Sequence, residues 1–483
     1  MQGELSTCSK LPSIRGLLPS VCAIFMSLFV NNLASAQDSS QLSATDAAIT
    51  MPGRFTVAAV GDLIIRQPLS QFDDEGLQAA LDIIRNADVA VGNFEGSLSR
   101  TKEFDGPMRG FMGVHEVAPD IKEMGFDLMN RANNHLLDSE YEGMFTTNEL
   151  LEEAGLVIAG AGQNLEQAAA PSYLELPSGR VSFVGMHTPN GVASRRLAAS
   201  YRAGNLGGKP GLNMLNFSSQ IVLTSEQVDM LRQIRDQLFD TAGNYDNPRT
   251  QPRNEPDNLL EFYSSASGRE DPVFRVALPG EIPGTIDYEM NRRDLDRILQ
   301  SIRAGKFYSD FAVATIHAHQ SQSVIENFHL ATRPPAFYID LAHQAIDNGA
   351  DIWVGHGVHT LRGVEIYNGK PIFYGLGEFV RQMNWNLEAQ MGLSDINSRE
   401  RTGPTPQSLE SLLTLSIYQD GDLVEVLLYP IELRHRGPNS QLGIPRIAPP
   451  EMGLPILQRV QRLSRELGTE IDIRDNVGVI RVR

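Results

Sequence analysis

From Arg54 onward, short apolar runs rich in β-branched residues alternate with segments of helical apolar spacing. Strand-like runs followed by helices and then by further strand-like runs are typical of parallel or mixed α/β layers. The predicted strands are FTVAAV, 88–93, FDLMN, LVIAG, FAVATIHAH and the stretch that begins DIWVGH; the predicted helices are 75–86, about 140–154 and 336–348. We therefore expect an α/β fold.

Two parts of the chain depart from this alternation. Residues 190–256 are dense in Gly, Asn and Pro around one predicted helix at about 225–238, which predicts a long irregular insertion that shapes access to a site. Later, LLTLSIY and LVEVLLYPIEL flank an Asp-Gly-Asp turn and predict a β-hairpin, and Leu454–Leu467 is an amphipathic helix. We expect residues 54–435 to form one domain, and 436–483 a C-terminal extension with a capping helix.

The N-terminus has the pattern of an export signal. Lys10 and Arg15 supply positive charge, Leu17–Val30 is apolar, and Ala-Ser-Ala at 34–36 is a small-x-small cleavage site. The apolar run is shorter than the roughly 20 residues that span a bilayer comfortably. We expect residues 1–36 to be a signal peptide and 37–53 a linker, and the protein to be periplasmic or at the cell surface. A signal that is retained would instead anchor it to the membrane.

Composition excludes several classes of protein. Of 483 residues, 41% are hydrophobic and 21% charged, and the formal net charge is −18. An acidic chain lacks the clustered basic residues that neutralise nucleic-acid phosphates, so we expect no nucleic-acid partner. Both cysteines, Cys8 and Cys22, lie in the signal segment, which leaves no thiolate for catalysis or metal binding in the mature chain.

Polar motifs follow the predicted strands, at the carboxyl ends where α/β folds bind ligands. They are Gly61-Asp62, Asn93-Phe94-Glu95, Asn133-Asn134-His135, His317-Ala318-His319 and Gly355-His356-Gly357-Val358-His359. Taken singly, each has a simpler interpretation: an Asp or Glu after a strand often caps the next segment, and Asn134-His135 could be a hydrogen-bonded loop pair. Together they predict one polar site at one sheet edge.

The histidines favour a metal site. The chain has 10, and four of them form two pairs directly after apolar strands. Imidazole combined with carboxylate and amide oxygens suits Zn, Mn or Fe, whereas an all-oxygen site would suit Mg or Ca. The spacing is not the HExxH of helical zinc proteases.

The order of these motifs, GD, NFEG, NNHLLDSEYEGMF, IHAH and GHGVHTLRGVEIYNGKPIFYGLGEF, resembles the CapA-type capsule proteins, a branch of the calcineurin-like metallophosphoesterases. The likeness spans about Arg54 to Leu433. It implies a four-layer αββα sandwich with two divalent ions, Mn, Zn or Fe, at the strand ends.

The resemblance also implies roles for particular residues. Asp62 and His359 would bind the first ion, and Glu95, where the superfamily usually has a bridging Asp, would contact both. Asn134, His317 and His356 would bind the second ion. His135 would be the catalytic residue that stabilises or protonates the leaving oxygen.

The chain departs from the superfamily in two ways. Ile64 occupies the histidine position of the usual Asp-x-His, so the first ion would have fewer ligands. Many CapA-type sequences have Trp-Gly where this chain has Ala318-His319, so His319 would be an added ligand, a substrate contact or an outer hydrogen-bond partner. Three weaker candidates lie near the same motifs: His187, and Arg66 and Arg131, which could hold an anion or pair on the surface.

The resemblance implies an exported protein that acts on anionic envelope polymers such as poly-γ-glutamate, or within a complex that makes them. Two ions could activate water against a phosphoester, so we expect a metal-dependent phosphoesterase-type hydrolase. Fold does not fix function, and two alternatives remain open at this point. One is a non-catalytic, metal-bearing subunit for polymer binding or export, and the other is a metal-dependent hydrolase of the polymer amide.

Overall fold

The structure is a computed structural model that describes residues 50–100, 110–190, 192–242, 256–261, 272–323, 331–382, 406–435, 438 and 441–482. The expected signal peptide, and the linker up to residue 49, lie outside the described residues. Among the described residues, no helix is both long and apolar enough to cross a membrane.

The larger of two main sheets contains the N-terminal strands. In the described part of the chain it has ten strands, with β1 (Arg54–Ile64), β2 (Val89–Phe94), β5 (Leu128–Asn130) and β6 (Val157–Ala159) parallel and adjacent. On its other side, β1 pairs with β20 (Glu410–Gln419), which pairs in turn with β21 (Asp422–Leu433). Strands β20 and β21 form the hairpin that the sequence predicts. The remaining strands are β19 (Glu378–Arg381), β22 (Pro445–Ile447), β23 (Asp472–Arg474) and β24 (Val477–Arg481).

The second main sheet has six strands among the described residues. Its order is β17 (Val364–Tyr367), β18 (Lys370–Phe373), β16 (Ile352–His356), β15 (Phe311–His317), β9 (Gly179–His187) and β8 (Ser172–Leu176). The four inner strands are parallel, and β17 and β8 are antiparallel edges.

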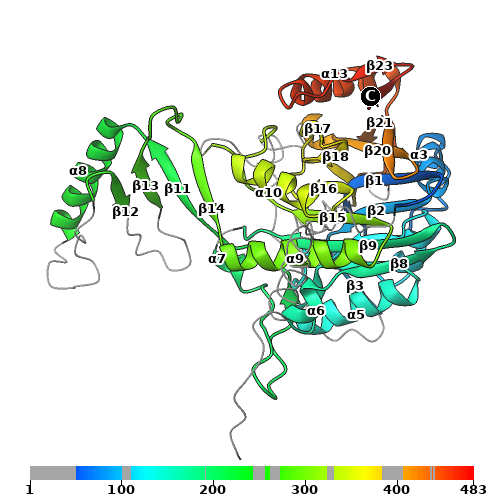
Figure 1. Ribbon diagram of the computed structural model, residues 1–483, viewed down its shortest axis with the longest axis horizontal. Helices are drawn as coiled ribbons and strands as arrows, with labels where there is room; N and C mark the ends of the chain where they lie inside the picture. The colour runs from blue at the N-terminus through cyan, green and yellow to red at the C-terminus, as the bar shows by residue number, and fades with distance from the viewer. Residues whose placement is uncertain are drawn as a thin grey trace, which may run out of the picture. The chain divides into compact units, whose positions relative to one another are not determined.

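Alternate residues of each inner strand point to opposite faces, so each main sheet has two apolar faces. Phe55 and Val57 of β1 pack in one core cluster with Phe183 of β9 and Val313 of β15, which joins the two sheets. The outer face of the larger sheet packs with α3 (Glu75–Arg85), α4 (Val117–Glu123) and α5 (Glu140–Glu153). The outer face of the second sheet packs with α9 (Arg292–Phe307) and α10 (Ala336–Asp347), as Figure 1 shows.

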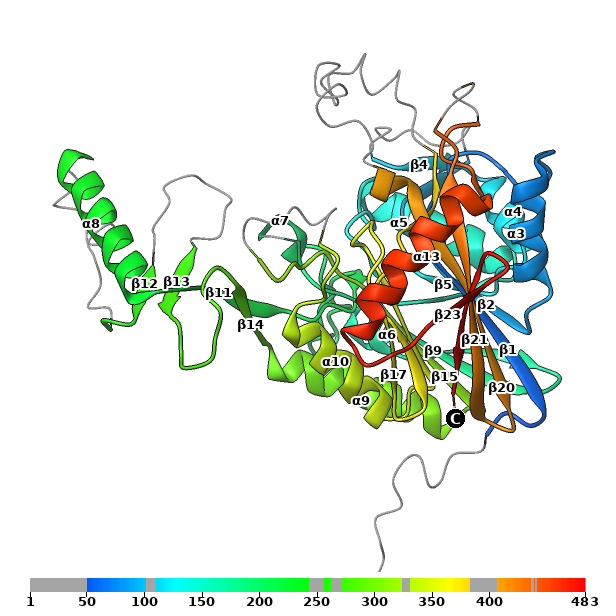
Figure 2. The ribbon, with the colours of Figure 1, turned by 90° about the horizontal axis from the view of Figure 1, so that it is seen from above.

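Local sequence explains the helices at these positions. The Asp74 side chain accepts a hydrogen bond from Leu77 N at 3.0 Å and caps α3, whose buried residues recur at helical spacing. The helix α13 (Pro450–Arg465) begins with proline at its first turn and packs on β21 and β17, strands of different sheets (Figure 2). The mixed α/β class and the helices predicted at α3, α5, α8, α10 and α13 are confirmed.

The segment predicted as an irregular insertion contains regular elements where the structure describes it. They are α7 (Val192–Arg195), β10 (Gly211–Leu212), β11 (Phe217–Leu223) and α8 (Ser225–Ala242). Strand β11 lies in a small sheet of order β12 (Leu259–Glu261), β13 (Val273–Val276), β11 and β14 (Ile286–Met290). Aromatic contacts of Phe217 and Tyr288 with Phe337 of α10 attach this small sheet to the second main sheet. The short elements left are β3 (Ser97–Ser99), β4 (Met112–Val114), β7 (Ala161–Gly162), α6 (Leu165–Ala169) and the 3₁₀ helix η2 (Pro406–Leu409).

Candidate metal centre

The carboxyl ends of the parallel strands bring the polar motifs together. In the larger sheet, Asp62, Asn93 and Asn130 are in register across β1, β2 and β5. In the second sheet, His187, His317 and His356 are in register across β9, β15 and β16. Motifs that are far apart in the sequence therefore become neighbours in space.

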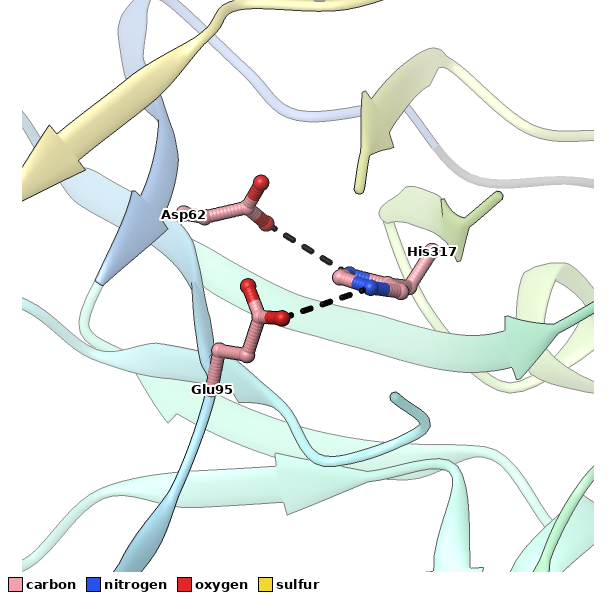
Figure 3. A group of neighbouring side chains, drawn as sticks. All are labelled: Asp62, Glu95 and His317. Carbon is pink, nitrogen blue, oxygen red and sulfur yellow. Dashed lines mark ion pairs between the residues drawn. The ribbon is translucent and has the colours of Figure 1, made fainter. Parts of the chain in front are cut away.

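Asp62, Glu95 and His317 form the centre of this site. They offer ligand atoms that all lie within 4.8 Å of one another, and all three side chains are buried. Figure 3 shows both carboxylates directed at the His317 ring, with Asp62 Oδ1 3.5 Å from Nδ1 and Glu95 Oε1 3.8 Å from Nε2. Two carboxylates and an imidazole at this spacing, away from water, are suited to a divalent ion.

Asp62 is held firmly in its ionised form. Its Oδ1 accepts a hydrogen bond from Asn93 Nδ2 at 2.8 Å, and its Oδ2 accepts one from the backbone of Gly357 at 3.0 Å. Burial alone would raise the pKa of Asp62, but hydrogen bonds and positive charge from His317 and His359 outweigh it and hold that pKa well below its usual range. Asp62 can therefore serve as an anionic ligand over the whole physiological pH range.

Glu95 provides the strongest indication that an ion belongs here. It is fully buried, and neither of its carboxylate oxygens has a hydrogen-bond partner. Burial is the main reason that its pKa is raised, and the nearby Asp62 charge adds to this. A buried carboxylate without hydrogen bonds is costly unless a cation compensates it. A metal ion bound to Glu95 removes that cost.

Two predicted ligands of the second ion also have ligand atoms without partners. Both ring nitrogens of His356 and the side-chain oxygen of Asn134 are buried and lack hydrogen-bond partners. Burial lowers the pKa of His356 to about 4, so its ring is neutral and can donate a lone pair to a metal. The residues present therefore fit the divalent metal that the donor types imply.

His359 lies between two carboxylates, those of Asp62 and Glu378. Its Nδ1 is 3.3 Å from Asp62 Oδ2 and 3.0 Å from Oε1 of Glu378 on β19. Its backbone has φ 54°, in the left-handed region that few residues other than glycine adopt. Such a conformation is maintained by surrounding structure and is common at functional sites.

His135 is oriented by an acid and an aromatic ring. Its Nδ1 lies 2.6 Å from Asp138 Oδ2, its Nε2 lies 3.5 Å from Glu95 Oε1, and its ring packs 4.3 Å from the ring of Phe111. Burial lowers the pKa of His135, but the Asp138 hydrogen bond and the charges of Glu95 and Asp138 raise it by more. The His135 ring therefore favours its protonated form, with Nε2 directed toward Glu95.

His187 and His319 are two neutral histidines beside His317. The carbonyl of His317 accepts from His187 Nδ1 at 2.7 Å, so the lone pair of His187 is on Nε2, which is buried and has no hydrogen-bond partner. The His319 ring lies 4.7 Å from His317 and 5.6 Å from His359. Burial, with the neighbouring histidines, holds the pKa of both rings well below the usual value.

The two arginine candidates contact the loops around the centre. Arg66 Nε donates to the carbonyl of Met112 at 3.2 Å. Arg131 is completely buried, which excludes pairing on the surface, and burial lowers its pKa to about 9. It donates to the carbonyls of Phe94 and Gly96 at 3.0 and 2.9 Å, so it fixes the backbone on both sides of Glu95.

We expect Arg131→Met to lower the free energy of unfolding by about 1–3 kcal/mol, because the buried Gly96 carbonyl loses its Arg131 donor, while the Phe94 carbonyl keeps the Asn133 side chain as a donor. Chemical denaturation of the purified protein in a chelator measures this value. Arg66→Met, which removes the half-buried hydrogen bond to Met112, is the matched control and should cost less than about 1 kcal/mol. Equal stability of the Arg131 variant and the wild type would contradict a structural role for Arg131.

Sequence reasoning did not assign three residues that the structure places at this site. Asn93 donates to Asp62 and lies 3.1 Å from His317 Nδ1, while its own oxygen accepts from Asn130 at 2.9 Å. Asp138 orients His135, and Glu378 lies beside His359. All three belong to the quoted motifs NFEG, NNHLLD and GLGEF. The signals that could have identified them are a polar residue at the end of a strand, for Asn93 and Glu378, and an acidic residue three positions after a histidine, for Asp138.

The fold and the site define a class: mixed α/β proteins with a buried carboxylate–histidine centre at the strand ends. Residues 56–383 match the family described as "Bacterial capsule synthesis protein PGA_cap", and the chain belongs to this family. It is 35% identical to the proteins y4sH and y4uA of Sinorhizobium fredii, over 89% of this chain and 93% of each relative.

More distant relatives have descriptive names. The chain is 22% identical to the "Capsule biosynthesis protein CapA" of Bacillus anthracis, over 72% of this chain and 64% of that protein. It is also 22% identical to the "PGA biosynthesis protein CapA" of Bacillus subtilis, over 68% of this chain and 63% of that protein. The resemblance to CapA-type proteins expected from the motifs is thereby confirmed.

Proposed function

We propose that this protein is an exported metal-dependent hydrolase of the phosphoesterase type. It would act in the synthesis or processing of a capsule, of poly-γ-glutamate or of a related envelope polymer. The observation that carries the proposal is a set of buried ligand atoms without hydrogen-bond partners, on Glu95, Asn134 and His356. Beside Glu95 lies His135, whose other ring nitrogen contacts Asp138. The names of the distant relatives support the polymer context.

The finer architecture and the metal sites are part of the proposal. The three apolar clusters support a four-layer αββα sandwich of metallophosphoesterase type. Asp62 and His359 would hold a first ion, and Glu95 would contact both ions. The second ion would be held by the remaining ligands: Asn134, His317 and His356. The candidate metals are Mn, Zn and Fe. Such ions would activate water and neutralise charge on a phosphoryl group.

The remaining residues orient the substrate and supply the proton. His135 as an imidazolium would donate its Nε2 proton to the leaving oxygen, and Asp138 would keep the ring in position through Nδ1. Arg131 and Asn93 would hold the loops and Asp62 in a fixed arrangement, so that little reorganisation is needed during the reaction. His319 and His187 would lie at the margin of the site as neutral hydrogen-bonding groups.

The acidic chain, with formal net charge −18, needs local cations in order to approach an anionic polymer or phosphoester. A metal centre at the strand ends would supply them, which favours binding at this site over binding elsewhere on the surface. The partner would be such a polymer or an assembly that makes it, in the periplasm or at the cell surface.

Hydrolysis assays test the proposal. The Mn- or Zn-loaded protein is incubated with p-nitrophenyl phosphate, with bis-p-nitrophenyl phosphate and with poly-γ-glutamate; the control carries Asn134→Ala and His356→Ala together. We expect turnover of a phosphoester that the double variant has lost. Cleavage of poly-γ-glutamate alone would replace the proposal by amide hydrolysis. Metal binding without turnover of any substrate would favour a polymer-binding subunit.

A further inference from the structure

Strand β19 places a further carboxylate, that of Glu378, beside the candidate metal centre. Glu378 is not one of the proposed metal ligands. Glu378 and Asp62 are partners in the parallel pairing of β19 with β1. The Asp62 amide donates to the Gly377 carbonyl at 3.0 Å, and a Cβ on Gly61 would overlap that same carbonyl. Glycine at 61 therefore permits the close approach that puts the two acidic side chains next to each other.

Glu378 is ionised although it is almost completely buried. Arg381 Nη1 donates to Oε1 at 2.8 Å and to Oε2 at 2.7 Å. Because Arg381 is three residues along the same strand segment, the chain provides its own cation to keep this carboxylate charged.

The other neighbour of Glu378 is His359. The Nδ1 atom of His359 lies 3.0 Å from Glu378 Oε1, and 3.3 Å from Asp62 Oδ2. An ionised carboxylate has no hydrogen to donate, so His359 Nδ1, which faces two carboxylates, is the nitrogen that carries a hydrogen whether the ring is charged or neutral. Nε2 is then the nitrogen that can give up its hydrogen and offer a lone pair. Metal-binding histidines in proteins commonly have this arrangement, with the second ring nitrogen donating to a carboxylate.

We propose that Glu378, held by Arg381, is a positioning residue of the metal centre that orients His359 and keeps the hydrogen on its Nδ1. Nε2 is then the atom that His359 offers to an ion. With His359 held in this way, the Asp62 carboxylate is available as a ligand. The inference rests on the metal centre of the proposed function, and it adds a residue outside the ligand set.

The test measures metal affinity, which does not depend on any substrate. Mn²⁺ or Zn²⁺ is titrated into the metal-free protein by calorimetry, for the wild type, Glu378→Ala, Glu378→Gln and a matched control. Glu365→Ala is that control. Glu365 of β17 lies 3.0 Å from Nε2 of His343 on α10 and accepts a hydrogen bond from the Tyr374 hydroxyl at 2.6 Å. The two residues form another carboxylate–histidine pair, which is not part of the candidate metal centre. Circular dichroism checks that each variant is folded.

We expect Glu378→Ala to weaken metal binding about 10- to 100-fold, the usual effect of losing an outer partner of a ligand. Glu378→Gln keeps an oxygen that can accept from Nδ1, so it should weaken binding less than the Ala variant does. If the Ala variant fails to fold, the Gln variant is compared with the wild type and should bind more weakly, because the negative charge beside His359 is lost. The Glu365 control should bind like the wild type. ¹⁵N-histidine NMR of the loaded protein should show His359 protonated on Nδ1 and coordinated through Nε2.

Different failures have different meanings. A wild type that binds no ion would overturn the metal centre of the proposed function. A wild type that binds, with a Glu378→Ala variant of equal affinity, would overturn only the role of Glu378. Coordination of His359 through Nδ1 would also overturn it, since Glu378 could not then accept that hydrogen.

Discussion

Glu95→Gln should give a protein that is more stable without metal and nearly unable to bind it. The variant keeps the size of the side chain but removes a fully buried charge whose oxygens have no hydrogen-bond partners. In the presence of a chelator at pH 7, we expect the free energy of unfolding to rise by about 1–3 kcal/mol. Metal affinity should fall by at least about 100-fold, more than the loss of an outer partner costs.

The pH dependence of this effect has a definite sign. The folded-state pKa of Glu95 is raised above its usual value, so the folded protein favours the protonated form. The stability that protonated Glu95 contributes is complete below its ordinary pKa, and it is lost as the pH rises through the raised one. The advantage of Glu95→Gln over the wild type should therefore grow as the pH rises from the ordinary pKa toward neutrality, and urea denaturation at several pH values measures it.

A buried glutamate with a partner provides the control. Glu410 pairs with Arg459, so Glu410→Gln leaves a cation without its partner and should destabilise the protein. Opposite signs for the two substitutions would tie the effect of Glu95 to the absence of hydrogen-bond partners on its carboxylate. A Glu95→Gln variant that is less stable than the wild type in a chelator, or that binds metal as tightly, would contradict Glu95 as a ligand.

His135→Ala should abolish turnover and leave the metal in place. Loss of a positioned acid typically costs about 10²- to 10⁴-fold in rate. His135 Nε2 is 3.5 Å from Glu95 Oε1, near the candidate ligands, while its Nδ1 is occupied by Asp138 at 2.6 Å and is not available to an ion. Turnover of a phosphoester and metal content by elemental analysis are measured on the same preparations.

Removal of a paired histidine on α10, the helix that covers the second sheet, controls for nonspecific loss of a histidine: the variant is His343→Ala. It should leave turnover and metal content unchanged, because His343 stacks on Tyr367 and pairs with Glu365 in that sheet. Unchanged turnover in His135→Ala would remove His135 from the mechanism. Loss of metal in that variant would make His135 a ligand in place of an acid.

Periodicity predicted the main elements of the fold because most of them have one strongly apolar side. The inner strands β1 and β15 are buried on both faces and are continuous apolar runs in the sequence, and α3 and α13 have clear amphipathic spacing. The small sheet was not predicted. Its strands β11 and β14 are only partly buried, so their composition resembles that of a loop.

Local motifs predicted which polar residues could form a site, because the ends of parallel strands meet at one edge. They did not predict which residues would be neighbours across the two sheets. Glu378 lies beside Asp62 and His359 because β19 pairs with β1. These two strands are more than 300 residues apart in the sequence, so no local pattern predicts their pairing. The pairing of His135 with Asp138, at a spacing of three residues, is a local feature and was within reach of the sequence.

Metal content tests the central claim most directly. The purified wild type and the Asn134→Ala, His356→Ala double variant are loaded with Mn²⁺ or Zn²⁺, freed of excess ions and analysed for elements, with circular dichroism to confirm folding. We predict that the wild type retains divalent metal in stoichiometric amount and that the folded double variant retains less. A wild type that retains no metal under any loading condition would contradict the metal centre.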